Sequence, residues 1–223
     1  MLNFSEAGHR VEPGQIWELG RHRLLVGDAL KTNHYPAEGV DLVLTDPPFE
    51  MPAREQIAAC KRAANAWIVA GCGPQYAKLV CLSGVRFWWE VVCLRNAPHS
   101  LEGWAGPHSL HWGNAFLTTG GEHLFDRSLA TGRFRSGNYF PSVIGPYKSA
   151  GGGEHAKPLG WALDLLACCH ARTVADPFAG SGTVLIACEK LGKTCYATEI
   201  DPERCRLILA RWEHATRGKA KPL

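Results

Sequence analysis

The chain has 223 residues, of which 46% are hydrophobic and 20% charged, and a formal net charge of +3 at pH 7. These values exclude intrinsic disorder, which combines low hydrophobicity with high net charge, and the length predicts one domain spanning residues 1–223. A net charge this small does not by itself indicate a nucleic-acid-binding protein.

The cysteines and the apolar runs indicate the cellular compartment in which we expect the protein. The nine cysteines include no C-x-x-C pair, and several, such as Cys93 and Cys188, lie in apolar runs, so we expect buried thiols in a reducing compartment. His108 and His111 have a spacing that could hold a metal, but no cysteines or acidic triad stand nearby, so no metal site is expected. Without a signal-peptide pattern or an apolar run of bilayer-spanning length, we expect a cytoplasmic protein with no membrane contact.

The first half of the chain alternates between apolar runs and helix-compatible residues. Strands are predicted at residues 16–19, 23–26, 40–45, 67–70 and 86–94. The first two, joined by a turn at Gly20, form a hairpin, and a helix is predicted over residues 54–64. The third ends abruptly at Asp46-Pro47-Pro48-Phe49, because two prolines permit neither a helix nor a central strand.

Residues 96–154 are rich in glycine and show no clear periodicity, whereas the pattern after them is regular. Helices are predicted to begin near Pro158, Val184 and Pro202, with strands at residues 173–176 and 194–199 between them. Alternating strands and helices of this kind indicate an α/β fold with a mostly parallel sheet covered by helices.

A glycine loop, Asp176-Pro-Phe-Ala-Gly-Ser-Gly-Thr183, is the strongest local signal. Gly180 and Gly182 would let a ligand approach the backbone, and the following helix offers free N–H groups. Glu199, at the end of the next strand, is placed to accept hydrogen bonds from a ribose diol, so the pattern indicates a nucleoside ligand. Leu185 replaces the third glycine of the dinucleotide fingerprint and no Lys follows the loop, so NAD and ATP fit poorly.

The Asp46-Pro47-Pro48-Phe49 segment is the second signal, because it follows a buried strand, where open α/β sheets place their ligands. Its prolines would hold a carboxylate and a carbonyl in one geometry beside an aromatic ring. That arrangement suits a planar base that carries an amino group. A rigid Asp-Pro turn with a purely structural role is the alternative.

These two motifs, in this order, resemble those of the S-adenosylmethionine-dependent amino methyltransferases of DNA, in the permuted β group. The lead-in segment 14–28 and Lys157-Pro158 are also similar to segments of that family, and the resemblance covers residues 14–50 and 154–212. It implies a Rossmann-like methyltransferase sheet, mostly parallel with an antiparallel strand and with helices on both faces. It divides the chain into a catalytic half (14–95), a loop-rich DNA-contact segment (96–154), a cofactor-binding half (155–212) and a basic tail (213–223).

The resemblance further implies site-specific methyl transfer from S-adenosylmethionine to the exocyclic N6 of adenine in DNA, because an Asp heads the catalytic motif. Asp46 and the Pro47 carbonyl would accept hydrogen bonds from the amine, and Phe49, next to Pro48, would stack on the flipped base. The cofactor would be bound by Asp28, Lys157, Pro158, Asp176, Phe178, Ala179, Gly180, Ser181, Gly182, Thr183 and Glu199. For Asp28, the alternative interpretation is a purely structural role. For the whole chain, the alternatives are cytosine-N4 methylation, an RNA or protein amide substrate, and an inactive DNA-binding protein.

Double-stranded DNA is therefore the expected partner. Arg133, Arg135 and Lys148 lie among glycines and aromatic residues, which suits phosphate contact and base stacking. Residues 202–223 contain six Lys or Arg against two Glu, which favours either phosphate contact or a solvated helix face. The middle segment is short for a family with an added recognition region, so a specificity subunit or a homodimer is also considered. Roles inside a restriction–modification system and outside one both stay open.

Overall fold

The computed structural model describes residues 8–71, 73–82, 84, 86–95, 111–118, 124–126, 129, 142–147 and 157–223. Ten strands in these residues form one sheet: β1 (Ile16–Leu19), β2 (His22–Val26), β3 (Leu42–Thr45), β4 (Ala66–Gly71), β5 (Arg86–Arg95), β6 (His111–Thr118), β7 (Ser142–Tyr147), β8 (Thr173–Asp176), β9 (Thr194–Glu199) and β10 (Lys221–Pro222). Five helices accompany them: α1 (Ala53–Ala63), α2 (Gly73–Leu82), α3 (Leu159–Ala167), α4 (Thr183–Lys190) and α5 (Pro202–Thr216). None of the described helices is long and apolar enough to cross a membrane.

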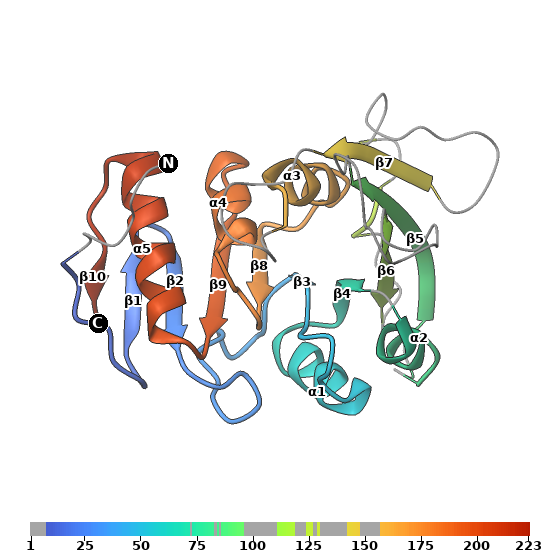
Figure 1. Cartoon of the computed structure of the whole chain (residues 1–223), viewed down its shortest axis with the longest axis horizontal. Coiled ribbons are helices and arrows are strands. Elements are labelled where there is room, and N and C mark those ends of the chain that lie inside the picture. The colour runs from blue at the N-terminus through green and yellow to red at the C-terminus, as the bar shows by residue number, and fades with distance from the viewer. Residues whose placement is uncertain are drawn as a thin grey trace, which may run out of the picture.

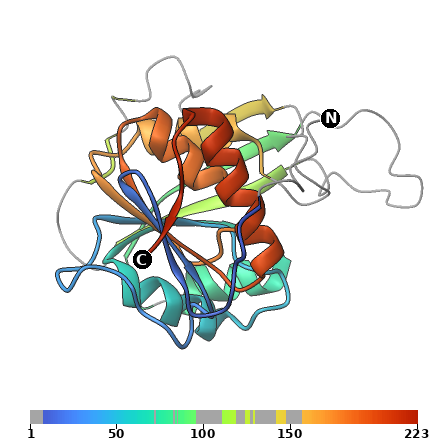
Figure 2. The same ribbon diagram turned by 90° about the vertical axis from the view of Figure 1, so that its left-hand side faces the viewer.

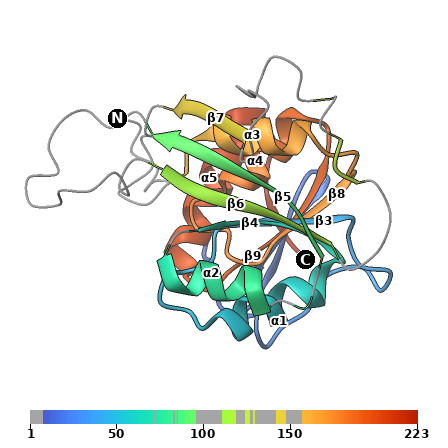
Figure 3. The ribbon, with the colours of Figure 1, turned by 90° about the vertical axis from the view of Figure 1, so that its right-hand side faces the viewer.

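The strands lie in the order β10-β1-β2-β9-β8-β3-β4-β6-β5-β7 (Figure 1). The centre, from β2 to β4, is parallel throughout, and only β1 and β6 oppose the common direction of the described strands. Helices α3, α4 and α5 lie on one face of the sheet and α1 and α2 on the other (Figure 3). The predicted fold class is thus confirmed.

The elements predicted from the sequence are present, with bounds that differ by no more than two residues. The sequence did not predict α2, β6, β7 or β10. Two of these, β6 and β7, lie in the glycine-rich middle segment, where no residue pattern identifies a strand. The division of the chain into functional segments stays a prediction.

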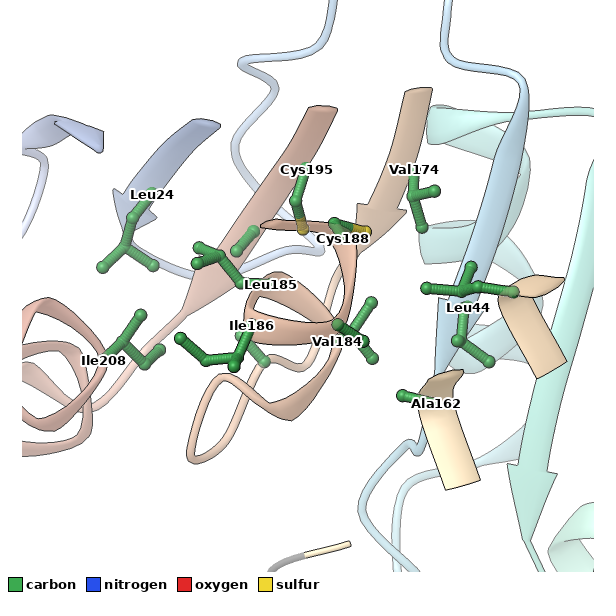
Figure 4. Close-up of a cluster of buried hydrophobic side chains, with 14 of the residues drawn as sticks. Leu24, Leu44, Ala162, Val174, Val184, Leu185, Ile186, Cys188, Cys195 and Ile208 are labelled. Carbon is green, nitrogen blue, oxygen red and sulfur yellow. The ribbon is translucent and has the colours of Figure 1, made fainter. Parts of the chain in front are cut away.

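Two apolar cores pack on the two faces of the sheet. Beneath α4 and α5, the fully buried side chains of Leu185 and Ile208 pack with sheet residues that include Leu24 and Val174 (Figure 4). The other core lies beneath α1 and contains Trp67. Among the cysteines whose side chains the structure describes, Cys81 is exposed, and the others, Cys60, Cys168, Cys169, Cys188, Cys195 and Cys205, are free and buried, as expected for small apolar residues.

The basic tail continues the fold beyond α5. Asp201 caps this helix by accepting a hydrogen bond from the Glu203 N–H at 2.9 Å, and Arg217 ends it in a left-handed conformation. The chain then turns back, and β10 pairs with β1 at the edge of the sheet that faces the viewer in Figure 2. A role for the tail's basic side chains in phosphate contact stays a prediction.

Gly182 provides a test of how closely α4 packs on α5. Its φ is 77°, and a Cβ there would lie 2.9 Å from Ile208 Cγ1. We expect Gly182→Ala to lower the free energy of unfolding by about 2–4 kcal/mol, because backbone strain and overpacking add. Gly14→Ala is the matched control, because Gly14 has a φ of 89° but open space around it. If urea denaturation gives equal losses for the two variants, close packing at Gly182 is wrong.

Candidate active site

A pocket of about 500 Å³ opens at the carboxyl ends of the central parallel strands. The segments that follow β2, β3, β8 and β9 line it, together with the residues around the start of α3. Helix α1, which follows β3, and helix α4, which follows β8, pack on opposite faces of the sheet (Figure 3). The pocket therefore lies at a topological switch point, where open α/β sheets bind their ligands.

Most of the predicted site residues meet in this pocket. Its lining includes the predicted catalytic residues Asp46, Pro47, Pro48 and Phe49 and the predicted cofactor residues Asp28, Lys157, Asp176, Phe178, Ala179, Gly180, Ser181, Thr183 and Glu199. Pro158 and Gly182 are not part of the lining, since Pro158 precedes α3 as its cap and Gly182 faces Ile208. Arg133, Arg135 and Lys148 lie outside the described residues.

The glycine loop and Glu199 form a cradle. The Gly180 N–H donates to Glu199 Oε2 at 2.7 Å, and the Asp201 N–H donates to Oε1 at 2.9 Å. Each carboxylate oxygen keeps a further lone pair that can accept a ligand hydroxyl. A Cβ at Gly180 would find only the Phe178 carbonyl oxygen within reach, at 4.0 Å, so the loop faces open space. The residues present therefore fit a ribose-bearing ligand.

Ile200 and Arg204 also line the pocket; sequence analysis missed Ile200 and considered Arg204 only among the basic residues of segment 202–223. The Ile200 side chain is 65% exposed although it directly follows Glu199. An apolar side chain left exposed beside a ribose-binding carboxylate can cover one face of a planar ring. The signal that could have found it is its place directly after the acidic residue that ends a strand.

The predicted catalytic motif Asp46-Pro47-Pro48-Phe49, called the catalytic loop below, is held by hydrogen bonds at its β3 end and at its α1 end. Thr45 donates a hydrogen bond to Asp176 Oδ1 at 2.7 Å, which ties the end of β3 to the end of β8. The loop then turns, with the Met51 N–H donating to the Pro48 carbonyl at 3.0 Å. Buried Gln56 on α1 donates to the Met51 carbonyl at 2.8 Å. Phe49, 56% exposed, is thereby presented at the mouth of the pocket on a fixed backbone.

Lys157 joins the two predicted halves of the site. Its ammonium forms an ion pair with Asp46 Oδ2 and lies 5.9 Å from the centre of the Phe49 ring. Its carbonyl accepts a hydrogen bond from Thr183 Oγ1 at 3.1 Å, so its backbone is tied to the start of α4. The resemblance implied a cofactor contact for Lys157, whereas in this structure its ammonium contacts the predicted catalytic carboxylate.

The Asp28 carboxylate forms a hydrogen bond and an ion pair with residues of its own loop. Its Oδ1 accepts the Leu30 N–H at 2.9 Å, and its Oδ2 lies 3.1 Å from Lys31 Nζ. The hydrogen bond from Leu30, with a smaller contribution from Lys31, lowers the pKa of Asp28 below its ordinary value. A contact between Asp28 and an adenine amine stays a prediction.

Asp176 is a buried acid of the pocket whose pKa departs far from its ordinary value. It is 3% exposed, and burial raises its pKa to about 7, with smaller contributions from the negative charges of Asp46 and Glu199. The hydrogen bonds from Thr45 and from the Phe178 N–H act in the opposite direction. Asp176 therefore titrates near neutral pH in the ligand-free protein.

The chain is similar to DNA methylases in sequence and in fold. Residues 163–210 match the family model described as DNA methylase. A search of curated proteins gave no match. TTHA0409, a protein from Thermus thermophilus described as a DNA modification methylase and solved with S-adenosyl-L-methionine, is 20% identical and has a TM-score of 0.65, over 89% of this chain and 96% of that one.

Two further solved structures have the same fold. M1.HpyAVI in its SAM complex is 18% identical, with a TM-score of 0.62 over 78% of this chain and 89% of that one. The cytosine-N4-specific PvuII DNA methyltransferase is 13% identical, with a TM-score of 0.63 over 85% of this chain and 84% of that one. The resemblance to the DNA amino methyltransferases is thus confirmed by the match over residues 163–210 and by the fold.

The pKa of Asp176 predicts a pH dependence of stability. A folded-state pKa of about 7 lies above the ordinary value of 3.8, so the native state binds a proton that the unfolded state lacks between these values. The free energy of unfolding should therefore fall as the pH rises from about 4 to 7, by a few kcal/mol in total, and level off above.

Asp176→Asn should remove this dependence while keeping both hydrogen bonds to Oδ1, from Thr45 and from the Phe178 N–H. Urea denaturation of the two proteins at several pH values measures it. Parallel pH profiles for the wild type and the variant would contradict the assignment.

Proposed function

We propose that the protein is a DNA methyltransferase that transfers a methyl group from S-adenosylmethionine to the exocyclic N6 of adenine. The observation that carries the proposal is the meeting, in one pocket, of the Asp46-Pro47-Pro48-Phe49 loop with the glycine loop and Glu199. The match to the DNA methylase family model and the shared fold support the same reaction class.

The cofactor side of the pocket is formed by Glu199, Ile200 and the glycine loop. Glu199 accepts hydrogen bonds from the ribose hydroxyls, and Ile200 covers the adenine ring. The carboxylates of Asp46 and Glu199, joined by Asp176 in its ionised form, give the pocket a negative potential that favours a positively charged ligand. When bound, S-adenosylmethionine supplies an electrophilic methyl group on its sulfonium.

The base side is formed by the catalytic loop. Phe49 stacks on a base that has left the duplex, while the Asp46 carboxylate and the Pro47 carbonyl each accept a hydrogen bond from an N–H group of its amine. These two acceptors turn the nitrogen lone pair toward the methyl group. The amine would gain a positive charge as it takes the methyl group that S-adenosylmethionine supplies, and the proton that it then loses would pass to the Asp46 carboxylate. The protein contributes positioning and electrostatic stabilisation of that charge.

The choice of adenine rests on the Asp at the head of the catalytic motif, which the resemblance associates with the adenine-N6 group. Cytosine-N4 methylation is the second candidate, because the fold is shared with the cytosine-N4-specific PvuII enzyme. Asp46 and Pro47 would contact the amino group, which adenine and cytosine both carry.

The deciding experiment measures transfer from labelled S-adenosylmethionine to unmethylated duplex DNA, followed by nucleoside digestion and mass analysis. We expect label in N6-methyladenine. Asp46→Ala should lower transfer by about a hundredfold or more, because a principal hydrogen-bond acceptor of the amine is lost. The dissociation constant of the cofactor should change little.

Asp46→Asn keeps the shape of the side chain and one acceptor oxygen but removes the negative charge, so it controls for collapse of the loop and should lose less transfer than Asp46→Ala. Label in N4-methylcytosine would change the target base and leave the proposed mechanism in place. Near-normal turnover of Asp46→Ala would contradict the role of Asp46.

DNA contacts are proposed on the rim of the pocket. Arg204, 57% exposed in its side chain, lines the pocket from the first turn of α5. Arg54 is exposed in the first turn of α1, which follows the catalytic loop, and forms no ion pair with another described residue. The Arg54 guanidinium is thus available to the phosphates that flank a flipped base, whereas the Arg204 guanidinium, whose Nε lies 3.7 Å from Asp201 Oδ2, would exchange that ion pair for a phosphate.

Arg54→Ala should weaken binding to duplex DNA and reduce the slope of log affinity against log salt by about one unit, because one phosphate contact is lost. Lys61→Ala is the matched control, since Lys61 is an exposed cation in the last turn of the same helix, away from the pocket. Fluorescence anisotropy at several salt concentrations measures both. Equal slopes for Arg54→Ala and Lys61→Ala would show that Arg54 does not contact DNA.

A further inference from the structure

Lys157 contacts Asp46 and lies over the Phe49 ring, the two side chains to which the proposed function assigns the target base. We propose that Lys157 is a positioning residue that competes with this amine: its ammonium holds Asp46 in the free protein and must withdraw before a base can bind. The inference rests on the proposed function and adds to it a step that controls when the site accepts a base.

The position of the ammonium carries the argument. It forms an ion pair with Asp46 Oδ2 and lies within 5.9 Å of the centre of the Phe49 ring. A base stacked on Phe49 with its amine on Asp46 would bring the amine to the same carboxylate, into the space over the Phe49 ring where the ammonium lies. The ammonium and the amine therefore compete for this space beside Asp46.

The backbone of Lys157 restricts how the residue can respond. Its carbonyl accepts the hydrogen bond from Thr183, and Pro158, with a φ of −61°, follows at the start of α3. Withdrawal therefore takes place by rotation of the long side chain, whose 17% exposure shows that it already reaches solvent. No rearrangement of the glycine loop is required.

The charges of the pocket explain why Asp46 has an internal counter-ion. Five acidic residues line the pocket, Asp28, Asp46, Glu50, Asp176 and Glu199, against two basic ones, Lys157 and Arg204. Without a ligand, the ammonium offsets part of this negative charge. Once a positively charged ligand shares the pocket, the ammonium is held less firmly, so the arrangement favours cofactor binding before base binding.

The competition predicts an order among substitutions at Lys157. Lys157→Met keeps the length of the side chain but removes the charge, so the KM for DNA should fall about threefold or more. Lys157→Arg should bind the carboxylate through two hydrogen bonds and raise the KM for DNA by a similar factor. A residue that binds the cofactor would behave in the opposite way, with Arg restoring function and Met losing it.

The experiment measures kcat and KM with unmethylated duplex DNA at saturating S-adenosylmethionine for the wild type and both variants. Calorimetry measures the affinity for S-adenosylmethionine without DNA. Lys190→Met is the matched control, because Lys190 is an exposed cation in the last turn of α4, away from the pocket. Loss of that charge should leave KM unchanged or slightly raised.

Two results together would support the proposal: a KM that increases in the order Met, Lys, Arg, and a Lys157→Met variant that binds the cofactor as tightly as the wild type or more tightly. An unchanged or reversed order of KM would overturn it, as would a Lys157→Met variant that binds the cofactor markedly more weakly. A double-mutant cycle that combines Lys157→Met with Asp46→Asn and measures the free energy of unfolding tests the ion pair independently of activity. A coupling energy of zero between the two residues would also overturn the proposal. A wild type that transfers no methyl group would instead overturn the proposed function.

Discussion

The parallel pairing of β3 with β8 is the contact on which the pocket depends, because it joins segments 131 residues apart. At one end, Asp41 Oδ2 accepts the N–H groups of Arg172 and Thr173 at 2.8 and 2.9 Å, and the Asp41 N–H donates to Thr173 Oγ1 at 2.9 Å. At the other end, Thr45 donates to Asp176. Side chains thus fix the register at both ends, and a shift by one residue would turn Thr45 away from Asp176.

The same pairing imposes an electrostatic cost. It brings Asp46 close to Asp176, and the next strand adds Glu199, so that three carboxyl groups share one pocket. Like charges at short range destabilise the native state, and burial of Asp176 adds to this cost. The apolar cores on both faces of the sheet outweigh it. A cationic ligand would offset the repulsion, so ligand binding and folding are coupled in this protein.

The sequence predicted the parts of the site that local pattern determines. The glycine loop and the Asp46 loop could be found because each follows an apolar strand and contains residues of restricted backbone freedom. The pairing of Lys157 with Asp46 could not, since it joins residues 111 apart and depends on how β3 lies against β8. Gly182 was interpreted as a ligand contact, but its surroundings show that it makes room for Ile208. The sequence did not predict β6, because this strand is determined by its pairing with β4 and β5, which local residue pattern does not encode.

The short strand β10 also affects how the protein behaves at high concentration. The Leu223 N–H donates to the Ile16 carbonyl at 2.8 Å, so the neighbouring Pro222, opposite Trp17, directs its nitrogen away from β1. Proline has no N–H to offer on that outer side, and Lys221 adds a charge beside it. An incoming strand from another molecule would therefore find no continuous row of donors there. This edge of the sheet is therefore protected against strand addition and aggregation.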